Sequence, residues 1–307
     1  MSSSLFNTVN PGLVSIERDL YNVICEEISR FGILCRVFSR VKSKKSMTEK
    51  FDRKGAGYYN QNRMMQDLFG IRIVAYFYED LDFIEHLLSK HFDEVGRNVD
   101  KGGLTEFKPL PRNIVYRLPD KDSKILLEIK SSYDEYKYVD TTFEIQLRSV
   151  LSEGWHEVDH VLRYKCHDEW KDIPEYDRML NGIYATLETS DKALKALFDD
   201  VAYCHYKKRN VTGMLRTKFR LDFLPAGLTK EISDILYEDK TAWKKIKKID
   251  RKDFLNSLSD SHLSLPITFD NLVYIINRMY LNNSQIKNLE PLNLRRDLDE
   301  LKFEISD

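Results

Sequence analysis

Apolar residues recur at helical spacing in two parts of the chain, near its start and through most of its second half. The first pattern predicts an amphipathic helix over about residues 14–38, with an Asn-Pro-Gly start signal before it. Its apolar positions are Ile16, Leu20, Val23, Ile24 and Ile28. The same spacing predicts helices over residues 81–91 and 176–206, and almost only helix from residue 151 onward.

Short runs rich in β-branched and aromatic residues lie between these helices and are typical of strands. They cover residues 71–77, 114–118, 125–129 and 141–147. Because helices and strands alternate without the regular spacing of a doubly wound sheet, we expect an α+β fold, a mixed β-sheet flanked by helices and followed by a helical C-terminal region. The expected divisions are an N-terminal helical segment (1–38), a sheet-containing domain (39–206) and the helical C-terminal region (207–307).

The composition is that of an ordinary globular protein. The 307 residues are 42% hydrophobic and 32% charged, and the formal net charge of −1 excludes nucleic-acid binding by overall charge alone. All apolar runs are far shorter than the roughly 20 residues of a membrane-spanning helix, so no membrane association is expected. The N-terminus lacks the basic region and apolar core of a secretory signal. The four cysteines show no CxxC spacing, which indicates reduced thiols in a cytoplasmic protein.

A dense group of cations and hydroxyls follows the first predicted helix. Its members are Arg40, Lys42, Ser43, Lys44, Lys45, Ser46 and Lys50. Arginine binds phosphate bidentately and lysine binds it as a point charge, so this group suits a polyphosphate. The alternative interpretation is the solvated face of an exposed helix.

Two carboxylates stand where a metal site could form. Asp67 precedes a Leu-Phe-Gly turn at the start of a predicted buried strand, and Glu144 lies on another strand with Gln146 and Arg148 on the same face. Magnesium usually binds one or two carboxylates together with substrate phosphates. The alternatives are that Asp67 forms the turn and that the strand shows its polar face to water.

The segment His156-Glu157-Val158-Asp159-His160 fits the HExxH pattern of zinc hydrolases. Two histidines four residues apart share a helix face and can bind zinc, with Glu157 as the base. A catalytic zinc needs a third protein ligand, and Glu175 and Glu188 have the right residue type. The alternative is that both histidines make polar contacts on a charged helix, and the short pattern often occurs by chance.

These groups together resemble the RelA/SpoT family of alarmone (ppGpp and pppGpp) synthetases. The resemblance runs from about residue 40 to 165 through RVKSKKSMTEKFDRKG, DLFGIRIVAYF, FEIQLR and HVLRYK, in the family order. It implies a small, stand-alone synthetase, with the synthetase domain over residues 39–206 and an added helical tail. The implied activity is that of an ATP-dependent pyrophosphokinase, which transfers the β,γ-pyrophosphate of ATP to the ribose 3′-hydroxyl of GDP or GTP with Mg²⁺ as cofactor.

The resemblance also implies roles for individual residues. Those expected to bind ATP are Arg40, Lys42, Ser43, Lys50 and Arg72. Asp67 resembles the principal magnesium ligand, and Glu144 resembles the carboxylate that activates the acceptor hydroxyl or shares the metal. Those expected on the acceptor side are Lys108, Arg112, Asn113, Gln146, Arg148, His160 and Lys165.

One loop departs from the family pattern. Where the family has a tyrosine that stacks on guanine, this sequence has Pro111, which offers no ring. The alternatives to a guanosine acceptor are therefore the 3′ end of tRNA and a catalytically inactive nucleotide-binding derivative. Residues 207–252 hold 14 Lys and Arg against 6 Asp and Glu, with interleaved aromatics, which suits RNA. The alternative for this segment is an ordinary helical domain with one basic face, and whether the chain forms a homo-oligomer stays open.

Overall fold

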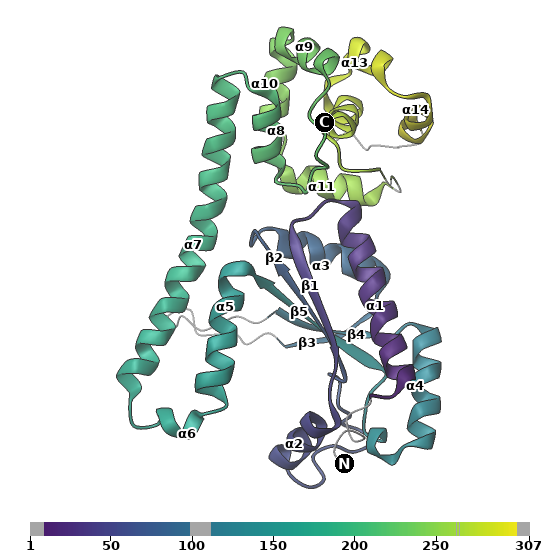
Figure 1. Cartoon of the computed structure of the whole chain (residues 1–307), viewed down its shortest axis with the longest axis vertical. Coiled ribbons are helices and arrows are strands. Elements are labelled where there is room, and N and C mark those ends of the chain that lie inside the picture. The colour runs from purple at the N-terminus through teal and green to yellow at the C-terminus, as the bar shows by residue number, and fades with distance from the viewer. Residues whose placement is uncertain (1–8, 99–111, 262, 264, 300–307) are drawn as a thin grey trace, which may run out of the picture. The chain divides into compact units, whose positions relative to one another are not determined.

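The computed structural model describes residues 9–98, 112–261, 263 and 265–299 (Figure 1). The chain divides into two compact units, and each is described by itself. Unit 1 comprises residues 1–26 and 35–190, and unit 2 comprises residues 27–34 and 191–307.

A five-stranded mixed sheet forms the centre of unit 1. Its strands are β1 (Cys35–Val41), β2 (Phe69–Ala75), β3 (Glu94–Asn98), β4 (Arg112–Arg117) and β5 (Thr142–Ser149). The order across the sheet is β1-β2-β5-β4-β3, with β2 and β5 parallel and the other pairs antiparallel. The parallel pair at the centre places the starts of β2 and β5 next to each other, which matters for the residues that these strands carry.

Alternation along the strands separates a covered face of the sheet from a polar face. Ile71 and Ile73 of β2 and Ile145 of β5 are buried on the covered face. Tyr116 and Phe143 extend this face, with ring centroids 5.8 Å apart. The residues between them in sequence therefore point to the opposite face.

The helical elements of unit 1 lie on both sides of the sheet. They are α1 (Pro11–Arg30, which continues into unit 2), α2 (Lys44–Lys54), α3 (Asp80–His91), α4 (Asp120–Ser132), η1 (Asp134–Tyr136), α5 (Val150–Asp159), η2 (His160–Tyr164), α6 (His167–Trp170) and the first part of α7 (Pro174–Lys207). Figure 1 shows α1 and α4 on one side of the sheet and α5 on the other. Helix α5 follows β5 directly, so it stands beside the polar face.

Two sequence predictions are wrong. The first predicted helix ends at Arg30, because Gly32 takes a left-handed conformation (φ +61°), and residues 35–41 form strand β1. The run at 125–129 lies within helix α4 instead of forming a strand. Asp122, Leu126 and Ile129 are its buried residues, at helical spacing. The short strand β3 was not predicted.

Unit 2 is helical. It contains the remainder of α7, then α8 (Val211–Phe219), α9 (Lys230–Glu238), α10 (Lys240–Lys248), α11 (Arg251–Asp260), α12 (Phe269–Ile276), η3 (Asn277–Leu281), α13 (Ser284–Leu289) and α14 (Leu292–Asp299). Aromatic side chains form much of its core. The Phe219 and Phe254 centroids are 5.1 Å apart, and Phe223 stacks on Phe269 at 4.1 Å.

The expected fold class is confirmed: a mixed sheet is flanked by helices, and a helical region follows it. The strands predicted near residues 71–77, 114–118 and 141–147 and the long helix near 176–206 are all present. Within the described part of the chain, none of the helices combines the length and apolar character needed to cross a membrane.

Candidate active site

A cationic pocket of about 360 Å³ lies beside helix α2. Ser43 caps this helix, because its hydroxyl accepts a hydrogen bond from the Ser46 amide at 3.2 Å. Ser43, Ser46, Lys50 and Arg53 follow at intervals of three or four residues, so they share one face of the helix. The complete lining is Arg40, Val41, Lys42, Ser43, Ser46, Glu49, Lys50, Arg53, His160 and Lys165. Five permanent cations against one carboxylate make this pocket suitable for a polyphosphate.

Asp67 is the anionic partner of two of these cations. Lys42 Nζ and Lys50 Nζ lie 2.6 and 2.7 Å from the same oxygen, Asp67 Oδ2. Burial by itself raises the pKa of Asp67, but the two ammonium groups outweigh it and lower that pKa below its ordinary value. Its other oxygen, Oδ1, is buried and has no hydrogen-bond partner among the described residues. Asp67 is therefore an ionised carboxylate with one oxygen available for a further ligand.

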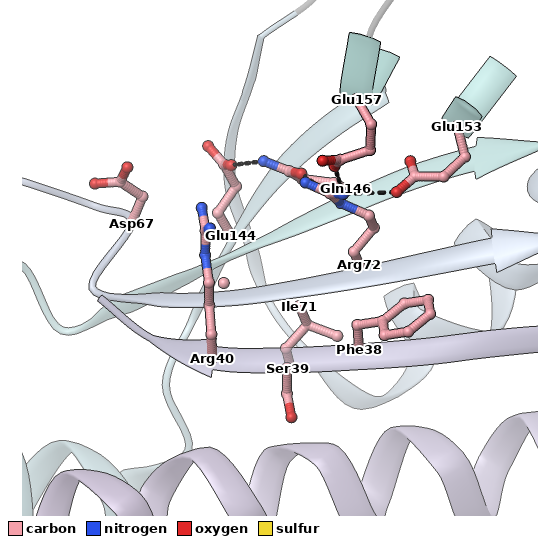
Figure 2. Close-up of a pocket in the computed structure, with 11 residues that line it drawn as sticks. Phe38, Ser39, Arg40, Asp67, Ile71, Arg72, Glu144, Gln146, Glu153 and Glu157 are labelled. Atoms are coloured by element: carbon pink, nitrogen blue, oxygen red, sulfur yellow. Dashed lines mark hydrogen bonds and ion pairs between the residues drawn. The ribbon is translucent and has the colours of Figure 1, made fainter. Parts of the chain in front are cut away.

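A second pocket, of about 390 Å³, opens on the polar face of the sheet (Figure 2). It is lined by Phe38, Ser39, Arg40, Asp67, Gly70, Ile71, Arg72, Glu144, Gln146, Glu153 and Glu157. Arg40 thus belongs to both pockets, so the cationic pocket and this carboxylate pocket adjoin there.

Strand register places the polar residues of the carboxylate pocket side by side. Arg40 pairs with Gly70, and Gly70 pairs with Glu144, so two pocket-lining side chains flank a residue without a side chain. Arg72 pairs with Gln146 two positions along. Figure 2 shows Arg40, Arg72 and Glu144 rising from the same side of the strands.

Hydrogen bonds order the far wall of this pocket. Gln146 Nε2 donates to Glu144 Oε1 at 2.7 Å, and Gln146 Oε1 accepts from Arg72 Nε at 3.2 Å. Arg72 Nη1 also donates to Glu153 at 2.6 Å and to Glu157, both on helix α5. Burial lowers the pKa of Arg72, but its two carboxylate partners outweigh burial and raise it. Arg72 is therefore a permanent cation that α5 holds against the strand wall.

The carboxylates of this pocket fit a divalent cation. Asp67 and Glu144 both line it, and the buried oxygen Asp67 Oδ1 lacks a protein partner. Among the described residues, no group of three or more His, Cys, Asp or Glu side chains could hold a metal ion. Two carboxylates completed by substrate phosphates are the set that Mg²⁺ commonly uses, whereas a catalytic zinc needs three protein ligands.

The residues of the HExxH pattern make contacts that do not involve a metal ion. Burial, together with the nearby charges of Arg148 and Arg72, lowers the pKa of His156 to about 4, and its ring lies against Trp155 and Tyr184. Glu157 pairs with Arg72. His160 lines the cationic pocket and stacks on Tyr164 at 5.8 Å. These contacts account for the pattern without zinc.

The residues predicted to bind the acceptor are spread over several places. Gln146 lines the carboxylate pocket, and His160 and Lys165 line the cationic one. Arg148 is buried and donates to Asn113 Oδ1 at 2.9 Å, and burial lowers its pKa.

Arg112 lines neither pocket. It donates to Asp82 Oδ1 at 2.6 Å, and its guanidinium lies 5.2 Å from the Tyr78 ring centroid. Lys108 and Pro111 lie outside the described residues.

Sequence reasoning missed several pocket residues. Ser46 was noted only as part of the basic group, and Arg53 was not considered, although both continue the helical face that begins at Ser43. Glu153 was given no role and Glu157 was considered only as the base of a zinc site, yet both line the carboxylate pocket, and their four-residue spacing on one helix could have signalled a shared contact. Phe38 has no such signal, because its segment was expected to be helical.

Comparison with known proteins gives a family match over this region. Residues 39–169 match the family model described as a region found in RelA / SpoT proteins. No curated protein matches the chain.

Several solved structures are similar to part of the chain. A GTP pyrophosphokinase family protein from Streptococcus pneumoniae is 19% identical, covering 62% of this chain and 89% of that one, with a TM-score of 0.45. Small alarmone synthetase 1 from Bacillus subtilis, bound to its product pppGpp, is 20% identical, covering 62% and 94%, with a TM-score of 0.46. Small alarmone synthetase 2 from Bacillus subtilis is 19% identical, covering 62% and 97%, with a TM-score of 0.45. Residues 39–169, which contain nearly all the residues that line the two pockets, therefore carry a RelA/SpoT region.

Proposed function

We propose that the protein is a Mg²⁺-dependent, cytoplasmic pyrophosphokinase that transfers the β,γ-pyrophosphate of ATP to the ribose 3′-hydroxyl of GDP or GTP. The observation that carries this proposal is the junction of a cationic pocket and a carboxylate pocket at Arg40, within the RelA/SpoT region. Phosphoryl-type transfer needs positioning and charge stabilisation more than covalent help from the protein, and the two pockets are suited to supply both.

The cationic pocket is assigned to the ATP triphosphate. Lys42 and Lys50 already converge on one point, Asp67 Oδ2, so their ammonium groups are held in place before a substrate arrives. Arg53 and Lys165 add charge at the same pocket. Arg40, shared by both pockets, is placed to contact the phosphates near the point of transfer.

The carboxylate pocket is assigned to the acceptor hydroxyl and the metal. Asp67 and Glu144 would hold Mg²⁺, which when bound neutralises phosphate charge. The 3′-oxygen forms a bond to the β-phosphorus of ATP, the bond between the β-phosphorus and the α,β-bridging oxygen breaks, and AMP leaves. Glu144 accepts the hydroxyl proton, and Gln146 holds this carboxylate through its hydrogen bond to Oε1.

A tRNA 3′ end is the second candidate acceptor, favoured by cation–aromatic contacts in unit 2. Lys247 Nζ lies 4.5 Å from the Tyr203 ring centroid and 5.1 Å from that of Tyr206, and Lys207 Nζ lies 4.6 Å from Tyr203. Tyr203 is exposed, as is Tyr237 under the guanidinium of Arg209. Exposed aromatic rings and lysines are groups that bind unpaired bases and phosphates.

Other residues of the basic segment favour the guanosine acceptor. Phe219, Phe223 and Trp243 are buried, so they offer no stacking surface. Arg220 and Arg251 are buried too. The segment therefore presents fewer aromatic rings and cations to RNA than its composition suggests, and we place GDP or GTP first.

The test is transfer of label from ATP labelled on the γ-phosphate, with Mg²⁺ and either GDP, GTP or bulk tRNA. We expect label on the guanosine nucleotide and release of AMP. Label on tRNA alone would replace the acceptor in this proposal, whereas bound ATP without AMP release in any arm would contradict the enzymatic function and favour an inactive nucleotide-binding derivative. Glu144→Gln, which keeps the side-chain shape, should remove the transfer in the active arm.

A further inference from the structure

The turn after α5 has unusual helical geometry. Residues 160–164 form the π-helical turn η2, and the amide of Lys165 donates to the carbonyl of His160, five residues back, at 3.3 Å. In a regular α-helix two residues five apart point roughly 140° away from each other. The wider π-turn instead brings them toward the same side, and π-turns are frequent at functional sites. His160 and Lys165 both line the cationic pocket.

One arginine within this turn fastens it to helix α7. Arg163 pairs with Asp159 on α5, and its Nη1 donates to Asp177 and Asn181 on α7, both at 2.9 Å. Its guanidinium also lies 5.3 Å from the ring centroid of Trp155. Arg163 is 17% exposed, and with two carboxylates around it this guanidinium is already neutralised.

Arg163 therefore differs in kind from the cations that line the pocket. It does not line either pocket, although it is only two residues from Lys165. A planar guanidinium can contact two carboxylates, an amide and a ring face at once. These contacts together hold the turn in one orientation, which a single ammonium group could not do. Lys165 itself is exposed, and a long exposed lysine has no fixed direction unless its backbone is fixed.

We propose that Arg163 is a positioning residue, which locks the π-turn η2 so that Lys165 and His160 face the polyphosphate of ATP. The inference rests on the proposed function, because the ATP triphosphate is the ligand of that pocket. It also moves these two residues from the acceptor side, where the sequence resemblance placed them, to the donor side. Arg163 acts chiefly through Lys165, the cation of the turn, so most of its contribution to nucleotide affinity depends on that lysine being present.

A double-mutant cycle tests this dependence. The full-length protein and its Arg163→Ala, Lys165→Ala and double variants are titrated with Mg²⁺ and the α,β-methylene analogue of ATP in a calorimeter. Loss of a charge-assisted contact should weaken binding about tenfold in Lys165→Ala. Arg163→Ala should weaken it several-fold, and the double variant should match Lys165→Ala. Arg163→Lys should restore little, because lysine lacks the planar fork.

Controls separate positioning from stability. Arg178→Ala removes an exposed arginine of α7 and should bind the analogue like the wild type. Thermal unfolding of every variant shows which ones remain folded. Should Arg163→Ala not fold, Asn181→Ala removes one α7 partner of Arg163 and enters the same cycle in its place.

Three outcomes decide the inference. Weakened binding in Arg163→Ala, together with equal affinity of the double variant and Lys165→Ala, supports it. Effects of the two substitutions that multiply, or wild-type affinity in Arg163→Ala, overturn it while leaving the proposed function intact. A wild-type protein that does not bind the analogue contradicts the proposed function itself, and the inference about its ligand fails with it.

Discussion

At the scale of single residues, Asp67 is a carboxylate kept ionised by its neighbours. Burial opposes its charge, and Lys42 and Lys50 more than offset that cost. Because its pKa is lowered in the folded protein, protonation at neutral pH is negligible, and the ionised form that the proposed metal site requires is present. The buried oxygen Oδ1 has no protein donor among the described residues, so a metal ion can bind there without first breaking a hydrogen bond.

We expect Asp67→Asn to reduce pyrophosphate transfer by about a hundredfold or more, since an electrostatic contact to the reacting phosphates is lost. The fold should persist, because asparagine has the same shape and Oδ2 can still accept hydrogen bonds. The measurement is initial-rate transfer from labelled ATP, together with circular dichroism. Asp52→Asn, an exposed aspartate on α2, is the matched control and should leave the rate unchanged. Near-normal turnover in Asp67→Asn would remove this residue from the mechanism.

His156 gives a prediction about stability and pH. Burial and two nearby arginines lower its pKa to about 4 in the folded protein, whereas an unfolded histidine titrates near pH 6.5. Between these values the unfolded chain binds a proton that the folded chain does not, so stability falls as pH drops from about 6.5 toward 4.

The histidine should account for a loss of about 1–2 kcal/mol in the free energy of unfolding between pH 7.5 and 5. His156→Gln cannot titrate and should lose less stability over this interval than the wild type. Urea unfolding at both pH values measures the difference, and His91→Gln, at an exposed position, serves as the control. An unchanged pH dependence in His156→Gln would show that this histidine titrates normally.

At the scale of elements, helix α2 presents one face to the cationic pocket and one face to solvent. Arg53 lines the cationic pocket nearly three turns after the Ser43 cap, whereas Lys45 is 85% exposed and lies outside the pocket. Both are cations of the same short helix, so comparing them separates a pocket contact from a general effect of charge.

Arg53→Ala should raise the KM for ATP about tenfold with a smaller effect on kcat, because its contact to the polyphosphate is made in the bound ground state as well as in the transition state. Lys45→Ala should change neither constant by more than about twofold, as expected for an exposed charge. Steady-state kinetics over a range of ATP concentrations provides both constants. Equal changes in the two variants would mean that α2 acts only through its overall charge.

The elements also show what sequence can and cannot predict. Strands β2 and β5 are buried runs rich in β-branched residues. Their alternation of apolar and polar positions could therefore be recognised in the sequence. Strand β1 was not predicted, because its residues fit the helical pattern of the preceding segment. The end of that helix depends on the left-handed backbone of Gly32, where an added Cβ atom would lie 2.9 Å from Ile267. In α4 the local apolar run looked like a strand, and only packing of one face of the segment makes it a helix.

The lining of the candidate site was predictable where residue type and spacing agree. Asp67 and Glu144 were identified by residue type, and the structure brings both to one pocket because parallel pairing of β2 with β5 aligns Gly70 with Glu144. Arg112 shows the limit of this reasoning. Its direction depends on strand register, and the register of β4 pairs it with Leu147 of the covered face, whereas its neighbour Asn113 pairs with Gln146. One residue of register decides between the two faces of a sheet.

At the scale of the whole molecule, charge is distributed unevenly. The chain has a formal net charge of −1, yet the cationic pocket gathers Arg40, Lys42, Lys50, Arg53 and Lys165 against Glu49 alone. The carboxylate pocket has the opposite balance, with four acidic side chains against Arg40 and Arg72. Adjacent pockets of opposite sign favour a bound polyanion on one side and a metal ion on the other, which overall charge could not reveal.

This distribution predicts where ligands protect the backbone from hydrogen exchange. The ATP analogue with Mg²⁺ should slow exchange in residues 39–54, 67–72 and 160–165, the segments that supply most of the pocket lining. If tRNA is the acceptor, adding it should also protect residues 203–209 and 240–248, where Tyr203, Lys207 and Lys247 lie, whereas GDP should not.

Mass spectrometry of peptic fragments measures both patterns on the same protein, and the α,β-methylene analogue lacks the bond that the reaction breaks, so the ligands are not consumed. Protection by tRNA in unit 2 together with label on tRNA would assign the helical region to acceptor binding. Protection confined to the two pockets, with the label transferred to GDP to give its 3′-pyrophosphorylated derivative, would instead leave unit 2 without a role in the reaction. Since the cation–aromatic contacts of unit 2 hold its own helices together in either case, only the response to RNA separates a binding surface from a structural one.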